Sequence, residues 1–249
     1  MEAPQLNQDC LIAVLATQVL ALQPSSFGAR ANAVPARAPA LCLPSGQLDL
    51  CPLLRRCAAL ERLSLAGLHR IASDELLRTV AASCPRLQEL VLDFCGGVTR
   101  AGLEHVQALV EGAPGLRCLS LRRCAGLGSV AALARLSRLE DLDLSYCARG
   151  SAAALAGSRG VLRRLCLHGC EGVGDEVCGQ LPLVEELVVA FTAVTDKGLA
   201  ALAAGSPQLR TLVLAKRSYN MWQTGLWTDE GLAAFKAAAP RAKVVLISC

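Results

Sequence analysis

The residues most suggestive of chemistry stand close together in the segment Cys166-Leu167-His168-Gly169-Cys170. Thiolates and imidazoles are ligands that zinc prefers, and a cysteine beside a histidine can act as an activated nucleophile. A tetrahedral zinc site needs four ligands that converge on one point, however, and a catalytic triad needs an acid that orients the histidine. No acid stands at triad spacing, so we expect neither a metal site nor catalysis in this segment.

Motifs of the common enzyme classes are missing from the rest of the chain. There is no glycine-rich phosphate loop, no G-x-S-x-G turn and no H-E-x-x-H helix. The chain has 3 histidines, of which His69 and His105 are expected on the surface. We therefore expect a protein that is not an enzyme, that needs no cofactor and that acts by binding other molecules.

The cysteines instead recur at a fixed place in the repeated pattern L-x-x-L-x-L-x-x-C. Four complete copies have their central leucines at Leu90, Leu119, Leu142 and Leu165, and they end on Cys95, Cys124, Cys147 and Cys170. Degenerate copies flank them and are centred at Leu63, Leu187, Leu212 and Val245. This self-similarity predicts a linear array of about eight repeats, in which the cysteines form a ladder of reduced, buried thiols.

Each repeat also carries the signals of a strand, a turn and a helix. The L-x-L core alternates as a half-buried strand does, and Thr195 and Thr228 stand where they can cap helices. The expected helices end before Pro85, Pro207 and Pro240. One such unit cannot bury its apolar face alone, so neighbouring units must stack. The sequence predicts an α/β fold, a right-handed solenoid shaped like a horseshoe, with a parallel concave sheet and convex helices.

These residues resemble the cysteine-containing leucine-rich repeats of F-box proteins. The consensus of that family joins the same core to a T-D-x-G-L turn, which stands here at residues 195–199 and 228–232. The resemblance covers residues 58–249 and implies a right-handed leucine-rich-repeat solenoid of the ribonuclease-inhibitor-like kind. It also implies that an F-box precedes the repeats and docks on a Skp-type adaptor, which joins the protein to the cullin scaffold of a ubiquitin ligase.

The chain before the repeats is expected to have two parts. Within residues 1–22, the segment 6–15 looks like the first F-box helix, and its adaptor-binding residues would be Leu6, Leu11, Ile12 and Leu15. The likeness ends after Leu22, because prolines interrupt any long helix there. Residues 23–46 are expected to be an Ala/Pro-rich connector, and residues 47–249 the repeat domain. For residues 1–22, a plain capping helix and a membrane-related role are the alternatives to a degenerate F-box.

The composition of the chain limits the classes of partner and the cellular compartment that we expect. The net charge of +4 comes from 25 basic and 21 acidic residues spread along the chain, which is not the pattern of a nucleic-acid-binding protein. No apolar run reaches the ~18 residues of a membrane-spanning helix. The 13 cysteines recur mostly at repeat positions, which favours reduced thiols in the cytoplasm or nucleus. We expect neither nucleic acid nor a membrane as a partner.

Side chains between the core leucines should project from the concave face with period two. One such column is mostly charged: Arg62, Glu89, Cys118, Asp141, Arg164, Glu186, Thr211 and Lys243. Opposite charges in adjacent rungs of this column, such as those of Asp141, Arg164 and Glu186, are expected to pair across the strands. The neighbouring positions become apolar toward the C-terminus, where the loop 217–228 also carries both tryptophans. This loop either anchors a partner or packs back on the protein. The predicted target-binding residues are Val188, Ala190, Val213, Ala215, Tyr219, Met221, Trp222, Trp227, Val245 and Ile247.

The expected function is therefore substrate recognition for an SCF-type (Skp–cullin–F-box) ubiquitin ligase, with an unidentified target protein held on the concave C-terminal repeats. A stand-alone scaffold or inhibitor without a ligase link is the alternative.

Overall fold

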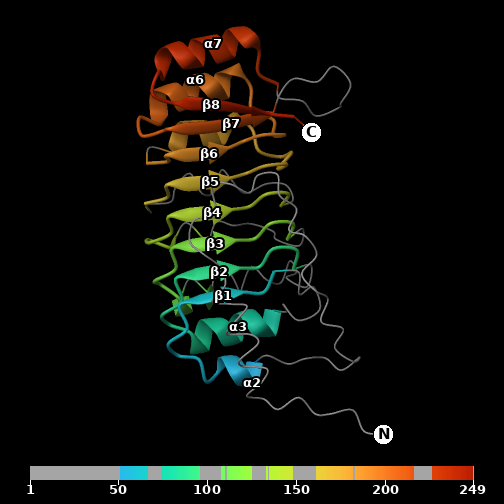
Figure 1. Ribbon diagram of the computed structural model, residues 1–249, viewed down its shortest axis with the longest axis vertical. Coiled ribbons are helices and arrows are strands. Elements are labelled where there is room, and N and C mark those ends of the chain that lie inside the picture. Colours follow the sequence, from blue (N-terminus) through green and yellow to red (C-terminus); the bar gives the residue numbers. More distant parts are fainter. Residues whose placement is uncertain are drawn as a thin grey trace, which may run out of the picture.

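The computed structural model describes residues 51–66, 74–95, 108–109, 111–124, 133, 135–147, 161–181, 183–215 and 226–248. Its dominant feature is one parallel eight-stranded sheet, in which every strand lies beside the next one along the chain (Figure 1). The strands are β1 (Arg62–Ser64), β2 (Glu89–Val91), β3 (Cys118–Ser120), β4 (Asp141–Asp143), β5 (Arg164–Cys166), β6 (Glu186–Val188), β7 (Thr211–Ala215) and β8 (Lys243–Ile247). All eight predicted strands are confirmed.

The register of the sheet aligns equivalent residues of successive repeats. Leu90 pairs with Leu119, Leu119 with Leu142, and Leu142 with Leu165. The central leucines from Leu63 to Leu212 are all buried and form one row of the core. Because side chains alternate along a strand, the residues on either side of each central leucine point to the opposite surface. We call this surface the sheet face.

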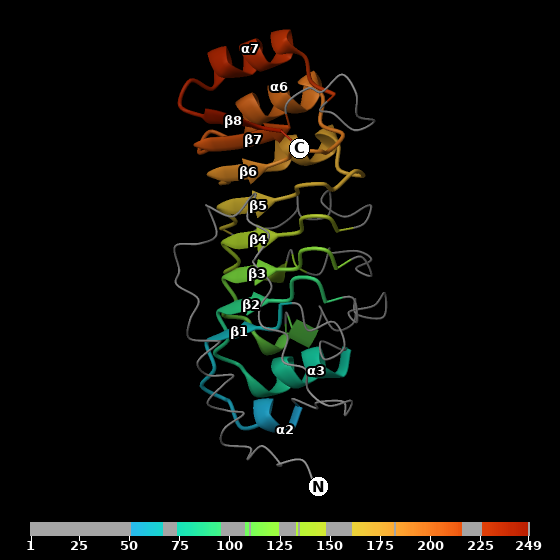
Figure 2. The ribbon, with the colours of Figure 1, turned by 45° about the vertical axis from the view of Figure 1, so that its right-hand side comes forward.

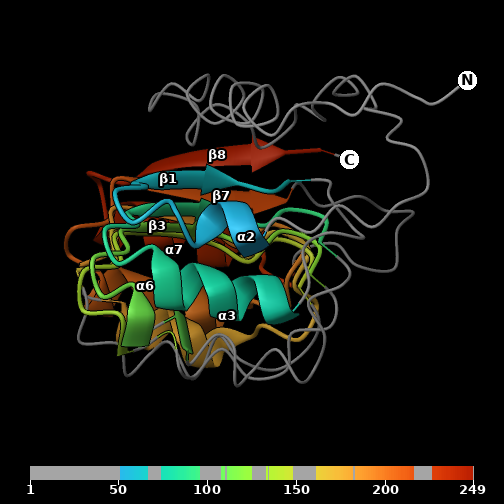
Figure 3. The ribbon, with the colours of Figure 1, turned by 90° about the horizontal axis from the view of Figure 1, so that it is seen from below.

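The helices lie behind the sheet. They are α2 (Cys51–Leu54), α3 (Asp74–Ser83), the 3-10 helix η2 (Asp175–Gln180), α6 (Asp196–Gly205) and α7 (Asp229–Ala238). Figures 2 and 3 show α3, α6 and α7 on the same side of the strands, away from the sheet face. The three helices expected before Pro85, Pro207 and Pro240 are thereby confirmed. None of the helices in the described ranges has the length and hydrophobicity needed to cross a membrane.

The Thr-Asp pairs of the turns join neighbouring repeats. Thr195 and Thr228 cap α6 and α7 as predicted, because their hydroxyl oxygens accept hydrogen bonds from the amides of Lys197 and Gly231. The carboxylate of Asp196 accepts hydrogen bonds from the amide and the hydroxyl of Thr228, both at 2.7 Å. Asp175 accepts hydrogen bonds from the amide and the hydroxyl of Thr195 in the same way, at 2.7 and 2.6 Å. Asp175 and Asp196 therefore each hold the cap of the following helix, a role that the sequence pattern did not reveal.

The cysteines at the ends of the complete repeats also join neighbouring repeats. Each thiol donates a hydrogen bond to a main-chain carbonyl of the preceding repeat: Cys95 to Leu65 at 3.2 Å, Cys124 to Leu92 at 3.1 Å, Cys147 to Leu121 at 2.9 Å and Cys170 to Leu144 at 3.0 Å. None of the 10 cysteines in the described part of the chain forms a disulfide. A disulfide or a thiolate could not donate this bond, so the ladder needs reduced, protonated cysteines.

Candidate binding face

The sheet face presents three columns of side chains that run across the strands. The first is the predicted one, because the pairing of the strands aligns Arg62 with Glu89 and continues rung by rung to Lys243. The second column follows the central leucines, and the third follows the next inward leucines. Short strands in fixed register therefore hold rows of outward side chains in set positions, which is the arrangement that a rigid recognition surface needs.

Charges in the first column pair across neighbouring strands. Arg164 Nε lies 3.1 Å from Asp141 Oδ1, which confirms one of the expected pairs. Arg62 Nε lies 3.6 Å from Glu89 Oε2. The expected pair of Arg164 with Glu186 is wrong, because no ion pair within 4.0 Å joins them in the described structure. Arg164 instead leans toward the N-terminal neighbour strand.

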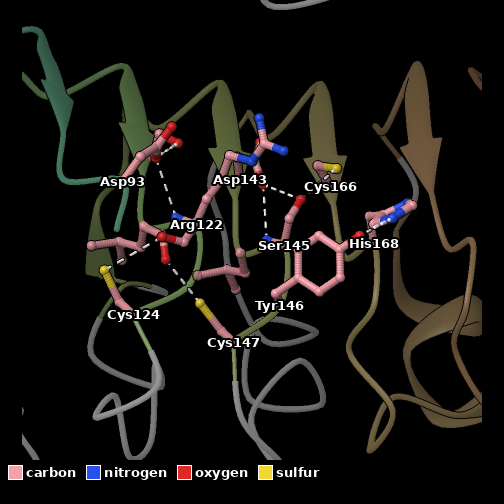
Figure 4. Close-up of polar contacts among 12 residues, drawn as sticks. Asp93, Arg122, Cys124, Asp143, Ser145, Tyr146, Cys147, Cys166 and His168 are labelled. Carbon is pink, nitrogen blue, oxygen red and sulfur yellow. Dashed lines mark hydrogen bonds and ion pairs between the residues drawn. The ribbon is translucent and has the colours of Figure 1, made fainter. Parts of the chain in front are cut away.

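A polar cluster occupies the second and third columns of β2 to β5 (Figure 4). Asp93 Oδ1 accepts hydrogen bonds from the hydroxyl of Ser120 and the amide of Arg122. Asp143 accepts two hydrogen bonds from Ser145, and its Oδ2 lies 3.7 Å from Arg122 Nε. Arg122 thus stands between two carboxylates on neighbouring strands. Sequence analysis missed this cluster because its members are distant in sequence.

Burial dominates the electrostatics of this cluster. It raises the pKa of Asp93, although the hydrogen bond from Ser120 opposes the change. It also raises the pKa of Cys166 to about 12, with the charge of Asp143 adding to the effect. A thiolate is the reactive form of cysteine. Cys166 therefore carries little of the thiolate form at neutral pH.

His168 is 9% exposed and lies beside this cluster. Its Nε2 lies 2.8 Å from the hydroxyl of Tyr146, and burial is the main cause that lowers its pKa. His168 is therefore mostly enclosed, although it stands in the third column of the sheet face. No group of three or more His, Cys, Asp or Glu residues within the described ranges could hold a metal ion.

A row of rings and one guanidinium borders the third column. Arg123 lies over the rings of Phe94 and Tyr146, at 5.5 and 4.8 Å from their centroids. His168 makes edge contacts with Tyr146 and Phe191 at 5.0 and 5.1 Å. Phe94, Arg123, Tyr146 and Phe191 all have φ between 54° and 60°, which is uncommon for bulky residues. The sequence does contain a signal for this row, because a bulky residue stands directly before each of Cys95, Cys124 and Cys147.

The predicted target-binding residues divide into three groups. Val188, Val213, Val245 and Ile247 are partly exposed on the sheet face, as predicted. Three predictions are corrected, because Ala190, Ala215 and Trp227 are 0%, 1% and 3% exposed. Trp227 belongs to the core, which is the alternative use of that loop. The remaining loop residues, Tyr219, Met221 and Trp222, lie outside the described residues, as do the predicted adaptor contacts Leu6, Leu11, Ile12 and Leu15.

The predicted domain boundaries before the repeats also lie outside the described residues, since residues 1–50 are not among them. The division into residues 1–22 and 23–46 therefore stays a prediction.

Comparison with known proteins finds repeat proteins. Internalin C2 from Listeria monocytogenes aligns with a TM-score of 0.54 at 16% identity, covering 80% of this chain and 92% of that chain. Toll-like receptor TLR13, solved in complex with ssRNA13, aligns with a TM-score of 0.50 at 16% identity, covering 82% and 31% of the two chains. These alignments, together with the parallel eight-stranded sheet, identify the fold. The fold is a leucine-rich-repeat solenoid.

Comparisons of the amino-acid sequence match a smaller part of the chain than the structural comparisons do. No family model matches the chain. A protein of Eremothecium gossypii, the antagonist of mitotic exit network protein 1, is 35% identical over 141 residues. The match covers 50% of this leucine-rich-repeat chain and 34% of that protein, so the chain spans about a third of its relative. These likenesses establish the fold, and what the solenoid binds has to be argued from its own surface.

Proposed function

We propose that this leucine-rich-repeat chain is a protein-binding module and serves as the substrate-recognition subunit of an SCF-type ubiquitin ligase. The observation that carries the proposal is the sheet face, where eight strands in fixed register hold outward side chains on the side away from α3, α6 and α7. Side chains that are already ordered lose little entropy on binding, so such a surface is suited to recognising a protein.

The ligase link rests on two resemblances. The repeats of residues 58–249 are similar to those of F-box proteins, and the segment 6–15 is similar to the first helix of an F-box. A Skp-type adaptor would join this segment to the cullin scaffold, and ubiquitin transfer would belong to the partner ligase. The raised pKa of Cys166 fits this division of labour, because a recognition subunit needs no thiolate.

The ladder thiols favour a cytoplasmic or nuclear location. Cys95, Cys124, Cys147 and Cys170 each use the S–H group to bond the preceding repeat. Reducing compartments keep such thiols intact, whereas secreted proteins tend to form disulfides.

A stand-alone inhibitor or scaffold is the second candidate. The relative from Eremothecium gossypii bears the name antagonist of mitotic exit network protein 1. A leucine-rich-repeat module can antagonise a protein by occupying its surface, without any link to a ligase.

Capture of a purified Skp-type adaptor by the full chain separates the two candidates. We expect the wild-type chain to retain the adaptor and the double variant Leu11→Asp/Leu15→Asp to lose it, because charged groups cannot enter an apolar interface without cost. Val213→Asp is the matched control. Val213 lies on β7, so this variant should keep the adaptor and weaken capture of the target. A wild-type chain that fails to retain the adaptor would refute the ligase role and leave the inhibitor.

A further inference from the structure

Acidic and basic side chains lie at different depths along the lip of the sheet, which is the edge where the strands begin. The residues directly before β3 to β7 alternate in charge along this lip: Arg117, Glu140, Arg163, Glu185 and Arg210. We call this row the lip ladder. Its ion pairs join Arg117 to Glu140 at 3.6 Å, Arg163 to Glu185 at 2.8 Å, and Arg210 to Glu185 at 3.5 Å. The arginine side chains are 54%, 57% and 74% exposed, whereas those of Glu140 and Glu185 are 37% and 26% exposed.

The same layering holds beside the lip ladder. Arg164 is exposed and Asp141 is mostly covered in their pair on β4 and β5. Burial raises the pKa of Asp141 even though Arg164 opposes the change. The carboxylates therefore form an inner layer and the guanidiniums an outer one. A molecule that approaches this lip meets arginine first, although the charges nearly cancel in number.

The inner carboxylates also orient the arginines. Glu185 lies between Arg163 and Arg210, contacting Nη1 of the first and Nε of the second. A guanidinium has five N–H donors, and one carboxylate cannot use them all. The donors that remain are held in place by the ion pair beneath, which suits them to receive a second carboxylate from outside.

The spacing of the three arginines sets the shape of that ligand. Arg117, Arg163 and Arg210 precede β3, β5 and β7, so they stand on alternate strands. Strands lie about 4.8 Å apart, which puts these arginines at intervals of roughly 10 Å. A peptide in the polyproline II conformation has three residues per turn and rises about 3.1 Å per residue, so its side chains three positions apart share one face and lie roughly 9 Å apart. An acidic residue at every third position would therefore meet one arginine each time.

We propose that the lip ladder binds an acidic segment of a partner protein in the polyproline II conformation, with carboxylates three residues apart lying on Arg117, Arg163 and Arg210. The proposal deepens the proposed protein-binding function and depends on it. Two exposed apolar side chains, Val161 and Leu183, stand two residues before Arg163 and Glu185 and would flank the segment. Nucleic acid fits less well, because a backbone with a charge about every 3.4 Å would also face Glu140 and Glu185.

The test uses the full chain and three labelled probes. The first is an extended peptide with glutamate at every third position, the second has glutamine at those positions, and the third is a single-stranded oligonucleotide. Binding is measured by fluorescence anisotropy at low and physiological salt. The lip variant is Arg117→Gln/Arg163→Gln/Arg210→Gln. The control, Arg55→Gln/Arg56→Gln/Arg135→Gln, removes the same charge from other exposed arginines.

We expect the glutamate peptide to bind the wild-type chain and the control, and the lip variant to bind at least tenfold more weakly. Equal losses in the lip and control variants would overturn the proposal, because the attraction would then be general. So would equal binding of the glutamine peptide, or tighter arginine-dependent binding of the oligonucleotide. Adaptor capture is measured on the same variants. If the wild-type chain retains the adaptor but does not bind the glutamate peptide, the acidic segment is refuted while the proposed function stands.

Discussion

Three of the four ladder cysteines, Cys95, Cys124 and Cys170, are buried as predicted, whereas Cys147 is only partly buried. Cys124 is 0% exposed, and burial raises its pKa to about 11. The same cause raises the pKa of Cys170 to about 11. The hydrogen bond that each thiol donates is also lost on ionisation. These residues therefore combine low access with a low content of the reactive thiolate.

Alkylation of the native protein should accordingly be slow at these positions. With iodoacetamide at pH 8, we expect Cys124 and Cys170 to react at least about 100-fold more slowly than in urea, since a pKa near 11 leaves roughly one thiol in 1000 ionised. Mass spectrometry of digested samples gives the rate for each cysteine. Equal rates with and without urea would show that the ladder is open or ionised.

His168 should make the stability depend on pH. Burial lowers its pKa in the folded state, helped by Arg122 and opposed by Asp143. The folded protein therefore binds this proton less readily than the unfolded chain. Stability from His168 is fully present above its unfolded pKa of about 6.5, and it falls as the pH drops through the lower folded pKa.

Urea unfolding at pH 7.5 and 5.5 measures this dependence. We expect the wild-type protein to lose more stability on acidification than His168→Gln, which cannot titrate. Comparing the two proteins cancels the contribution of Asp93, whose raised pKa acts in the opposite direction. An equal loss in both proteins would show that His168 is readily protonated in the fold.

At the level of helices, the contacts between repeats depend on the turns. Thr228 accepts a hydrogen bond from Gly231 N and donates its own proton to Asp196 of the preceding repeat. Gly231 lies so close to Asp196 that a Cβ there would collide with that carboxylate. The turn before α7 is thus a junction in which the cap of one helix and the first turn of another meet.

Removing the hydroxyl of Thr228 should therefore loosen α7. We expect Thr228→Ala to lower the free energy of unfolding by about 1–2 kcal/mol, the usual cost of a lost N-cap. Thr228→Ser keeps both hydrogen bonds and should cost less. Chemical denaturation followed by circular dichroism measures the two changes. If the serine variant were as unstable as the alanine variant, the loss of stability would come from the methyl group of Thr228 and not from its hydroxyl.

Over the whole molecule, each repeat is enclosed by its neighbours, so position along the stack decides how deeply a leucine is buried. Leu142 on β4 is 2% exposed, whereas Leu246 on β8 is only partly buried in the described structure. Repeat arrays gain stability mainly from contacts between adjacent units. The same residue type should thus contribute differently at the centre and on the last strand.

Truncation of the two leucines tests this gradient. Leu142→Ala should lower the stability by about 2–5 kcal/mol, because the neighbouring repeats cannot close the cavity. Leu246→Ala should cost clearly less, since its side chain is less enclosed. Thermal and urea unfolding of both variants give the comparison. Similar losses would mean that β8 is covered in solution as fully as β4.

Much of this architecture follows from local sequence. The alternation around Leu63, Leu90 and their equivalents needs only the period of a strand, and the repeat spacing needs only that identical units stack. These two patterns located all eight strands and the buried row. The first column of the sheet face followed as well, because neighbouring units contribute equivalent positions.

The depth of individual side chains depends on neighbours distant in sequence. Ala190 and Ala215 were expected outside by alternation, yet they are 0% and 1% exposed. Directly after Ala190 the chain turns, as φ 58° at Phe191 shows. The polar cluster and the layering of arginine over carboxylate arise from residues that are more than 20 positions apart. Local periodicity shows which way a side chain points, but its burial and its partners depend on what the adjacent repeats bring against it.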